Sequence, residues 1–152
     1  MIISEKNYSV ISKELLEKSH KDKIEKNVVR LIIKQNDAIL MLKRTKHDHF
    51  PDLYEPPGGG LEENEDIFSA GKRELYEETG LSIKEFVSIP EIYDFHSVSL
   101  RKYRGYVLNV LLEKGEIILN PDEHSEYRWV VASEVDSLPM FQNIRMIIKK
   151  FF

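Results

Sequence analysis

The sequence contains no cysteine. The chain therefore forms no disulfide and no thiolate metal site, which suits the reducing cytosol. It also lacks an apolar run long enough to span a membrane, and its N-terminal residues MIISEKNYSV lack the apolar core of a secretory signal. We therefore expect a cytoplasmic protein that has no membrane partner.

The chain also has no excess of basic residues. The chain has 22 Lys and Arg residues against 26 Asp and Glu residues, which gives a formal net charge of −4 at pH 7. Proteins that bind the backbone of nucleic acids usually present a basic face, so we expect no nucleic acid polymer as a partner. The length of 152 residues and the hydrophobic content of 41% are ordinary for one globular domain with one core.

The first 26 residues differ from the rest of the chain. They are rich in Lys and Glu and contain few apolar positions, so we predict an N-terminal extension at 1–26 and a main domain at 27–152. A short amphipathic helix at 12–19, with Ser12 as its cap, fits this extension. The extension either packs loosely on the domain as a solvated segment or serves as a dimerisation arm.

From Val28 onward the patterning predicts an α/β domain. Alternating runs and runs rich in β-branched residues indicate strands, and apolar residues at helical spacing indicate helices. Strands are predicted at 28–33, 38–44, 53–55, 82–89, 91–98, 106–112, 116–119 and 127–131, the first two joined as a hairpin, and helices at 66–79 and 140–152. Helices that flank a mixed sheet give an α/β fold.

The negative charge of the chain is concentrated in residues 59–81, GGLEENEDIFSAGKRELYEETGL, which we call the acidic segment. It contains seven acidic and two basic residues, a net charge of −5, so the remainder of the chain sums to about +1 (−4 minus −5). Glu74, Glu77 and Glu78 have the spacing i, i+3, i+4, which places them on one face of the predicted helix. Like charges in that arrangement repel one another unless a cation lies between them.

A divalent metal ion is one such cation. Mg²⁺ takes oxygen ligands and is usually held by a few carboxylates together with substrate phosphates. A metal ion so held neutralises phosphate charge and lowers the pKa of a bound water, which then acts as a nucleophile. Arg73 lies beside Glu77 on the helical wheel and can steady a carboxylate by a bidentate contact. The other interpretation of a glutamate cluster on a helix is a solvated face.

The acidic segment resembles the Nudix box, G-x5-E-x7-R-E-U-x-E-E-x-G-U, in which U is a bulky aliphatic residue. All nine fixed positions match, namely Gly59, Glu65, Arg73, Glu74, Leu75, Glu77, Glu78, Gly80 and Leu81. The surroundings are similar too, because a predicted hairpin and PPGG precede the segment and EYRWV and a predicted helix follow it. The resemblance implies that residues 27–152 form a Nudix hydrolase domain, an α/β/α sandwich with a mixed sheet flanked by helices.

The resemblance also implies roles for individual residues, with Mg²⁺ or Mn²⁺ as the cofactor. The expected metal ligands are Glu74, Glu77, Glu78 and the carbonyl of Gly58. The expected catalytic residues are Arg73, Glu74, Glu77 and Glu78, and the general base is either a glutamate of the box or an acid from a later loop. The expected supports of the box are Gly59, Glu65 and Gly80. For the general base we favour Glu126 over Glu123, since the polar loop before Trp129 should face the site.

Contacts to the substrate are predicted outside the acidic segment. Arg44 ends a strand that points towards the segment and would meet phosphate charge. Tyr54 offers an aromatic face for a base. Asn143 follows Leu138-Pro139 and resembles the asparagine with which nucleotide-sanitising relatives read a purine. Each of the three is otherwise an ordinary surface or core side chain.

The implied activity is the hydrolysis of a nucleoside diphosphate linked to a group X. A compact chain suits a (deoxy)nucleoside triphosphate, which a house-cleaning enzyme converts to the monophosphate and pyrophosphate. The alternatives are a nucleotide sugar, ADP-ribose, a dinucleoside polyphosphate, or a Nudix module that senses a nucleotide without cleaving it. The partner is then a small-molecule nucleotide, and the protein is a monomer or homodimer.

Overall fold

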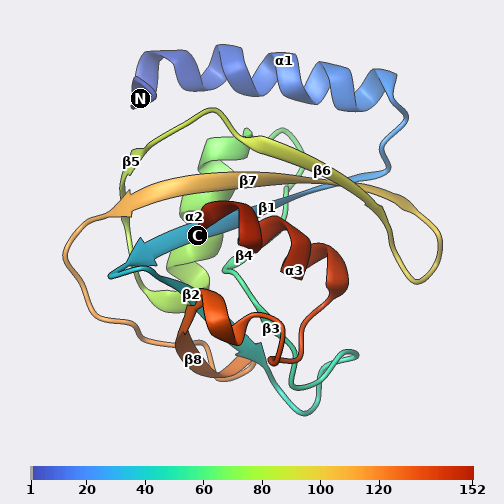
Figure 1. Ribbon diagram of the computed structural model, residues 1–152. Coiled ribbons are helices and arrows are strands. Elements are labelled where there is room, and N and C mark those ends of the chain that lie inside the picture. Colours follow the sequence, from blue (N-terminus) through green and yellow to red (C-terminus); the bar gives the residue numbers. More distant parts are fainter. Residues whose placement is uncertain (1) are drawn as a thin grey trace.

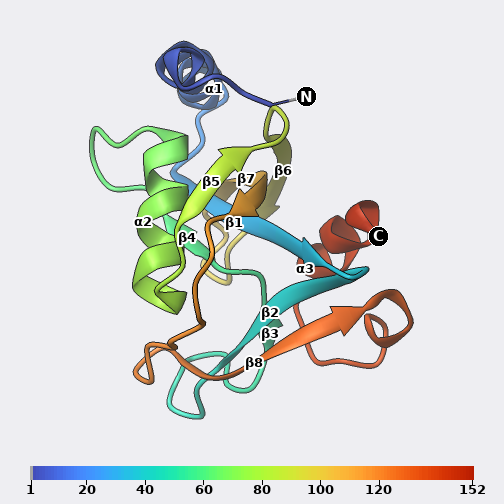
Figure 2. The same ribbon diagram turned by 90° about the vertical axis from the view of Figure 1, so that its left-hand side faces the viewer.

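A mixed sheet of eight strands forms the centre of the protein, for which a computed structural model describes residues 2–152. Helices α1 (Tyr8–Lys21) and α2 (Ile67–Thr79) lie on one side of the sheet, and helix α3 (Gln142–Ile148) lies on the other (Figures 1 and 2). The predicted α/β/α sandwich is therefore confirmed. None of the helices in residues 2–152 is long and apolar enough to cross a membrane.

The strands pair in the order β3-β2-β1-β7-β5, while β4 pairs with β1, β6 with β7, and β8 with β2. Their bounds are β1 Lys26–Gln35, β2 Ala38–Arg44, β3 Tyr54–Glu55, β4 Gly58–Gly60, β5 Ile83–Phe86, β6 Glu91–His96, β7 Lys102–Leu112 and β8 His124–Val131. The pair β1 and β7 is parallel and the other pairs are antiparallel. Short 3₁₀ helices cover Glu5–Asn7, Ala132–Glu134 and Lys149–Phe151.

The predicted hairpin is confirmed, and it also divides the sheet. Asn36 and Asp37 form its turn with φ angles of 50° and 62°, as a two-residue hairpin turn of the primed type requires. Strands β1 and β2 pair only next to this turn, at 34–35 and 38–39. Beyond it they diverge (Figure 2), so that β1 pairs with β4 and β7 and β2 pairs with β3 and β8. The opening between the two half-sheets is where the candidate site lies.

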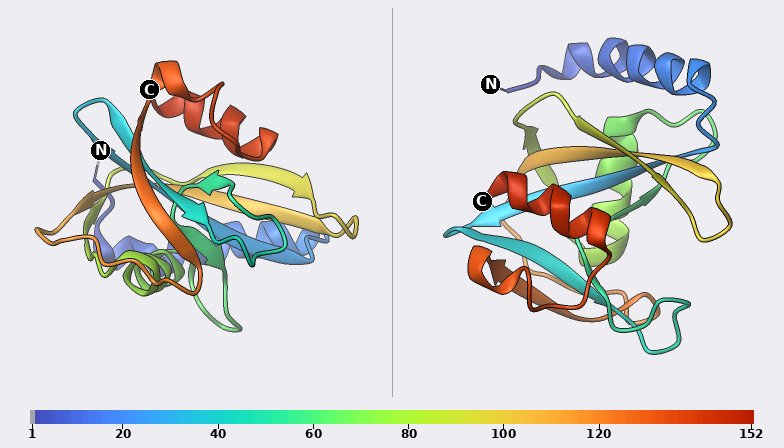
Figure 3. Two further views of the ribbon diagram at one scale, coloured as in Figure 1. Left: turned by 90° about the horizontal axis from the view of Figure 1, so that it is seen from below. Right: turned by 45° about the vertical axis from the view of Figure 1, so that its right-hand side comes forward.

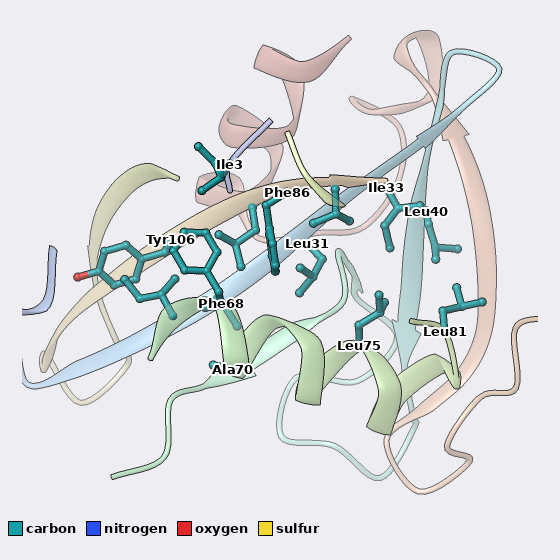
Figure 4. Close-up of a cluster of buried hydrophobic side chains, with 14 of the residues drawn as sticks. Ile3, Leu31, Ile33, Leu40, Phe68, Ala70, Leu75, Leu81, Phe86 and Tyr106 are labelled. Carbon is teal, nitrogen blue, oxygen red and sulfur yellow. The ribbon is translucent and has the colours of Figure 1, made fainter. Parts of the chain in front are cut away.

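Strand β1 is buried on both faces because its side chains alternate between two cores. Leu31 belongs to the core under α1 and α2, together with Phe68, Leu75 and Phe86 (Figure 4). Its neighbour Ile32 belongs to the core under α3. The continuous apolar run at 28–33 predicted this double burial.

Helix α2 carries most of the acidic segment, and its ends are those that the sequence indicates. The Asp66 side chain accepts the N–H of Ser69 at 2.9 Å as N-cap, and Gly80 ends the helix in the left-handed conformation with φ 71°. Gly71 packs directly on β7, since a Cβ atom there would lie 2.6 Å from Leu108 Cδ1. The helix is therefore fixed closely against the sheet.

Helix α1 is longer than the predicted helix at 12–19 and is packed on α2. The Tyr8 ring stacks on Phe68 with 4.6 Å between ring centroids. Ser12 is 1% exposed, and its Oγ accepts the N–H of Ile67 at 2.9 Å. This N–H lies in the first turn of α2, where no backbone acceptor is available within the helix. Residue Ser12 thus caps another helix, and not its own as predicted. The domain boundary after residue 26 stays a prediction.

Three further expectations differ from the structure. Residues 116–119 form no strand, because the chain leaves β7 at Leu112 and runs towards the end of α2, where the N–H of Ile118 bonds to Thr79 O at 2.8 Å. The glycines at 58–60, which lie outside every predicted strand, form the short strand β4 on β1. Helix α3 covers only part of the predicted 140–152 and crosses the face of the sheet opposite α2 (Figure 3).

Helix α3 provides a test of the second core. Ile148 is fully buried, whereas Met146 on the same helix is 63% exposed. We expect Ile148→Ala to lower the free energy of unfolding by about 2–4 kcal/mol through lost burial and a residual cavity. Met146→Ala should change it by less than about 0.5 kcal/mol. Urea denaturation measures both values, and equal effects would mean that α3 contributes little to the core.

Ser12 provides a test of the contact between α1 and α2. Ser12→Ala leaves the N–H of Ile67 buried without an acceptor, so the free energy of unfolding should fall by about 1–3 kcal/mol. Ser9→Ala, at an exposed position on the same helix, is the matched control. If both variants unfold at the same urea concentration as the wild type, the contact contributes nothing to stability.

Candidate active site

The carboxylates of Glu74, Glu77 and Glu78 lie on one face of α2 at different depths. Glu78 is buried, Glu74 is partly buried and Glu77 is exposed. This gradient follows from the orientation of the helix, since Leu75 and Gly71 point into the first core. The predicted ligand face therefore runs from solvent into the opening between the half-sheets.

Arg73 holds the acidic segment together. Its Nε and Nη2 donate to Glu65 Oε2 and Oε1 at 2.8 and 2.9 Å, a bidentate contact. Its Nη1 donates to Glu74 Oε1 at 2.9 Å and to Glu77 Oε2 at 3.3 Å, and its Nη2 also donates to Gly60 O at 3.1 Å. The hydrogen bonds from Arg73 hold the pKa of Glu65 below its ordinary value.

These contacts use one oxygen of each ligand candidate. Within residues 2–152, Glu74 Oε2 and Glu77 Oε1 have no hydrogen bond to another residue. Burial raises the pKa of Glu74 above its ordinary value against the opposing effect of Arg73, and the charges of Glu77 and Glu123 add to the rise. One guanidinium thus orients two carboxylates without fully neutralising them.

Glu78 is held by the backbone of Gly58. The N–H of Gly58 donates to Glu78 Oε1 at 2.7 Å. Only glycine fits there, since φ is 153° and a Cβ atom would lie 2.0 Å from the carbonyl oxygen of Val29. Burial raises the pKa of Glu78 to about 9, and the charges of Glu55 and Glu74 add to this rise. The contact seen is through the N–H of Gly58, and its carbonyl as a metal ligand stays a prediction.

Behind Glu78 lies a buried charged group that the sequence did not indicate. Glu55 is 5% exposed, and its Oε1 accepts Arg44 Nη1 at 2.7 Å and lies 3.7 Å from Arg30 Nη1. Its Oε2 lies 3.0 Å from Nε2 of the buried His124, whose Nδ1 lies 3.5 Å from Glu78 Oε2. Burial alone would raise the pKa of Glu55, but Arg30, His124 and Arg44 outweigh it and lower the pKa to about 2.

A signal for part of this group exists in the sequence. Arg30 interrupts the apolar run VVRLII, and Glu55 stands in a short predicted strand directly before PPGG. A charged side chain in a buried strand needs a partner of opposite charge, so these two residues could have been paired. No periodicity in the sequence distinguishes His124. Its position next to Glu55 results from the pairing of β8 with β2, in which His124 lies opposite Arg44.

The two later acids occupy different places. Glu126 Oε1 accepts the hydroxyl of Tyr54 at 2.5 Å and lies 3.9 Å from Lys43 Nζ, and no contact joins it to the α2 carboxylates within residues 2–152. Glu123 is the acid whose charge reaches Glu74. Glu126 as the general base therefore stays a prediction, with its side chain now placed against Tyr54.

The residues of the α2 face fit a divalent cation. Three carboxylates converge from one helix face, which is the oxygen donor set that hard cations prefer. Burial raises the pKa of two of them, and the guanidinium of Arg73, which reaches Glu74 and Glu77, is shared with Glu65. A bound divalent ion would supply the missing positive charge, neutralise phosphate and lower the pKa of a water molecule.

A cleft of about 410 Å³ opens beside this group. Its walls carry three cations (Lys26, Arg30, Arg44), five aromatic rings (Phe50, Tyr93, Phe95, Tyr103, Phe141) and Asn143. The rings of Tyr93 and Phe95 stack with 5.3 Å between centroids. A cleft of this size and composition suits a small molecule with an aromatic part and negative charge.

The structure places two of the three predicted substrate contacts on this cleft, Arg44 and Asn143. Tyr54 does not line it, because its ring is 5% exposed and belongs to the core under α3. A larger cleft of about 590 Å³ lies between α1 and residues 61–66. It contains no aromatic side chain and lies away from Arg30 and Arg44, so it offers no stacking surface for a base.

Known proteins match this chain in sequence and in fold. The family model described as NUDIX domain matches residues 25–151. The 8-oxo-dGTP diphosphatase of Buchnera aphidicola subsp. Schizaphis graminum is 34% identical over 108 residues, 71% of this chain and 78% of that protein. The RNA pyrophosphohydrolase of Caulobacter vibrioides is 31% identical over 127 residues, 72% of this chain and 74% of that protein. For three further curated relatives the match covers only 21% to 57% of their length.

The fold is similar to that of solved structures. The crystal structure of MutT NUDIX hydrolase from Burkholderia pseudomallei superimposes with a TM-score of 0.71 at 21% identity, over 84% of this chain and 98% of that one. At that level of identity the likeness concerns the fold, and it includes the sheet and helices that hold the acidic segment.

Arg73 provides a test of the site without any knowledge of the substrate. Arg73→Lys keeps the charge but loses the planar fork that reaches Glu65, Glu74 and Glu77 together. Since supporting contacts of metal ligands are typically worth roughly 10- to 100-fold in metal affinity, we expect Mn²⁺ to bind more weakly by that factor. Titration calorimetry measures it. Arg101→Lys, on the exposed β6–β7 turn, should leave Mn²⁺ affinity unchanged; equal affinities of both variants would contradict the role given to Arg73.

Proposed function

Since the chain belongs to the Nudix family of hydrolases, which act on phosphoric anhydrides, we propose that it converts a (deoxy)nucleoside triphosphate to the monophosphate and pyrophosphate. The proposed role is house-cleaning of the nucleotide pool. The proposed cofactor is Mg²⁺ or Mn²⁺, bound by Glu74, Glu77 and Glu78. A name among the relatives, 8-oxo-dGTP diphosphatase, supports this substrate class.

The observation that carries the proposal is the position of the cationic and aromatic cleft beside the acidic face of α2. Arg30 and Arg44 line this cleft and are joined through Glu55 to the group that contains Glu78. The Nε atoms of both arginines are buried and have no hydrogen-bond partner within residues 2–152. The exposed parts of the two guanidinium groups, whose side chains are 16% and 22% exposed, would bind phosphate oxygens, while the aromatic rings of the cleft would hold the base by stacking.

The residues of the chain would then divide the work. Arg73 and Glu65 hold Glu74 and Glu77 in place, and the N–H of Gly58 fixes Glu78. A general base, Glu126 as predicted or Glu123 by its proximity to Glu74, accepts a proton from the attacking water. The water oxygen bonds to the α- or the β-phosphorus while the bond from that phosphorus to the bridging α–β oxygen breaks. The leaving group, pyrophosphate in the first case and the nucleoside monophosphate in the second, carries away the electron pair.

A second substrate class is the 5′ end of RNA, since several relatives carry the name RNA pyrophosphohydrolase. The net charge of −4 favours a free nucleotide, because a polymer would meet a surface of the same sign. The cleft favours it also, since a volume of about 410 Å³ would accommodate one stacked base and a few phosphates. A nucleotide sugar, ADP-ribose and a dinucleoside polyphosphate share the same cleavable bond and belong in the same test.

The test is hydrolysis with Mg²⁺ across a panel of these compounds, with oxidised and ordinary deoxynucleoside triphosphates and a 5′-triphosphorylated oligoribonucleotide. We expect the highest kcat/KM on a free nucleoside triphosphate. Glu78→Gln keeps the shape of the side chain but loses its charge, and it should lower kcat at least about 100-fold. Glu63→Gln, at an exposed acid of the same segment, should retain the wild-type rate.

Two outcomes would contradict the proposal in different ways. A clear preference for the oligoribonucleotide would overturn the substrate class and leave the reaction class standing. Equally negligible rates for wild type and Glu78→Gln on every compound would contradict the proposed hydrolysis and favour a module that senses a nucleotide without cleaving it.

A further inference from the structure

The buried imidazole of His124 lies between two carboxylates. Its Nε2 is 3.0 Å from Glu55 Oε2, and its Nδ1 is 3.5 Å from Glu78 Oε2. The His124 side chain is 3% exposed, and those of Glu55 and Glu78 are 7% and 4% exposed. His124 is therefore shielded from water on the side of both carboxylates, so its two nitrogens must find their partners within the protein.

The contact with Glu55 determines which nitrogen carries the proton. Glu55 is ionised, because Arg44 and Arg30 lie 2.7 and 3.7 Å from its Oε1. An ionised carboxylate can only accept hydrogen bonds, so Nε2 of His124 is the donor to Glu55. In the neutral imidazole the lone pair is then at Nδ1 and points away from Glu55.

This leaves two electron-rich atoms facing one another. Nδ1 of His124 is buried and has no hydrogen-bond partner within residues 2–152. The atom opposite it, Glu78 Oε2, is the carboxylate oxygen that Gly58 does not use, since the N–H of Gly58 bonds to Oε1. A lone pair and a carboxylate oxygen repel each other at 3.5 Å unless a positive charge lies between them.

We propose that His124 Nδ1 and Glu78 Oε2 are ligands of one divalent cation, with Glu55 as the residue that orients the imidazole. The proposal rests on the proposed function in so far as Glu78 belongs to the metal-binding face. A metal-binding histidine almost always donates its other ring N–H to a carboxylate or carbonyl, which is the contact with Glu55. A separation of 3.5 Å suits two ligands with metal bonds of about 2.1 Å each.

A nitrogen ligand changes which metal the site prefers. Carboxylates and water alone suit Mg²⁺ and Mn²⁺, whereas an imidazole ligand moves the preference towards later transition metals such as Ni²⁺ and Zn²⁺. His124 and Glu55 come from β8 and β3, outside the acidic segment. The site therefore takes its nitrogen ligand from the second half-sheet, and the cation joins that half-sheet to α2.

The test uses the full chain loaded with Mn²⁺ alone, without any nucleotide. Pulsed EPR of bound Mn²⁺ detects a directly coordinated nitrogen by its ¹⁴N modulation. We expect this modulation in the wild type, and we expect it to change to the ¹⁵N frequency when the protein is made with ¹⁵N-labelled histidine. Because this comparison needs no mutation, it does not depend on a variant that folds. Wild-type protein whose bound Mn²⁺ shows no histidine nitrogen would overturn the proposal and indicate a shared proton between His124 and Glu78.

A variant then assigns the nitrogen to a residue. His124→Gln should abolish the ¹⁴N modulation and weaken Mn²⁺ binding roughly 10-fold or more, with a smaller effect on Mg²⁺. His20→Gln, at an exposed histidine on α1, should change neither. Unchanged modulation in His124→Gln would show that another residue supplies the nitrogen and would overturn the assignment.

These outcomes are separable from those of the proposed function, since the EPR signal requires no turnover. A chain that hydrolyses nucleotides through Glu78 but shows no coordinated nitrogen would keep the proposed function and lose the inference. A chain that hydrolyses none of the compounds but shows the His124 nitrogen coordinated to Mn²⁺ would contradict the proposed function and support the inference.

Discussion

Repulsion among carboxylates is the constraint on which the site depends. Glu74, Glu77 and Glu78 occupy one helix face within five residues, and two of them are withdrawn from water. Two contacts in the protein oppose this repulsion: the guanidinium of Arg73 binds Glu74 and Glu77, and the N–H of Gly58 binds Glu78. Each contact orients a carboxylate and neither removes the negative charge entirely. The remaining charge is what would give the site its proposed affinity for a divalent cation.

The same constraint explains why the surroundings of the site are so firmly packed. Carboxylates that repel one another would splay apart on a loose helix, so α2 is held at Gly71 by β7 and at Ile67 by Ser12 of α1. Glu55 is 5% exposed and remains ionised because two arginines, Arg30 and Arg44, lie beside it. Both arginines also line the cleft. The residues that stabilise the buried charge and those that would bind phosphate are in part the same.

The features that could be predicted from the sequence are those encoded locally. The cap at Asp66, the end of α2 at Gly80 and the turn at 36–37 depend on a few adjacent residues, and the spacing of the acids follows from helix geometry alone. Arg30 and Glu55 are recognisable from the sequence as charges in short buried strands that need partners. Their meeting with His124 could not be predicted, because it depends on strand pairing between distant segments. The prediction of a strand at 116–119 was wrong for a related reason. The alternation of apolar and polar residues there is weak, and contacts with the end of α2 determine the path of the chain. The length of helix α1 was underestimated, because most of its residues are charged and only a few residues, such as Tyr8 and Ser12, contact the domain.

The division of the sheet after the β1–β2 turn has a consequence for the order of folding. The parallel pairing of β1 with β7 joins Lys26 to Tyr103, and β2 finds its long partner only in β8, which ends at Val131. Long-range pairings of this kind form slowly, since the entropy of closing a large loop is lost before the contacts form. During synthesis the acidic segment emerges well before His124, so the nascent helix α2 exposes its carboxylates to water until β8 arrives. The enclosure of Glu78 on the side of His124 therefore requires β8 and comes after the synthesis of α2.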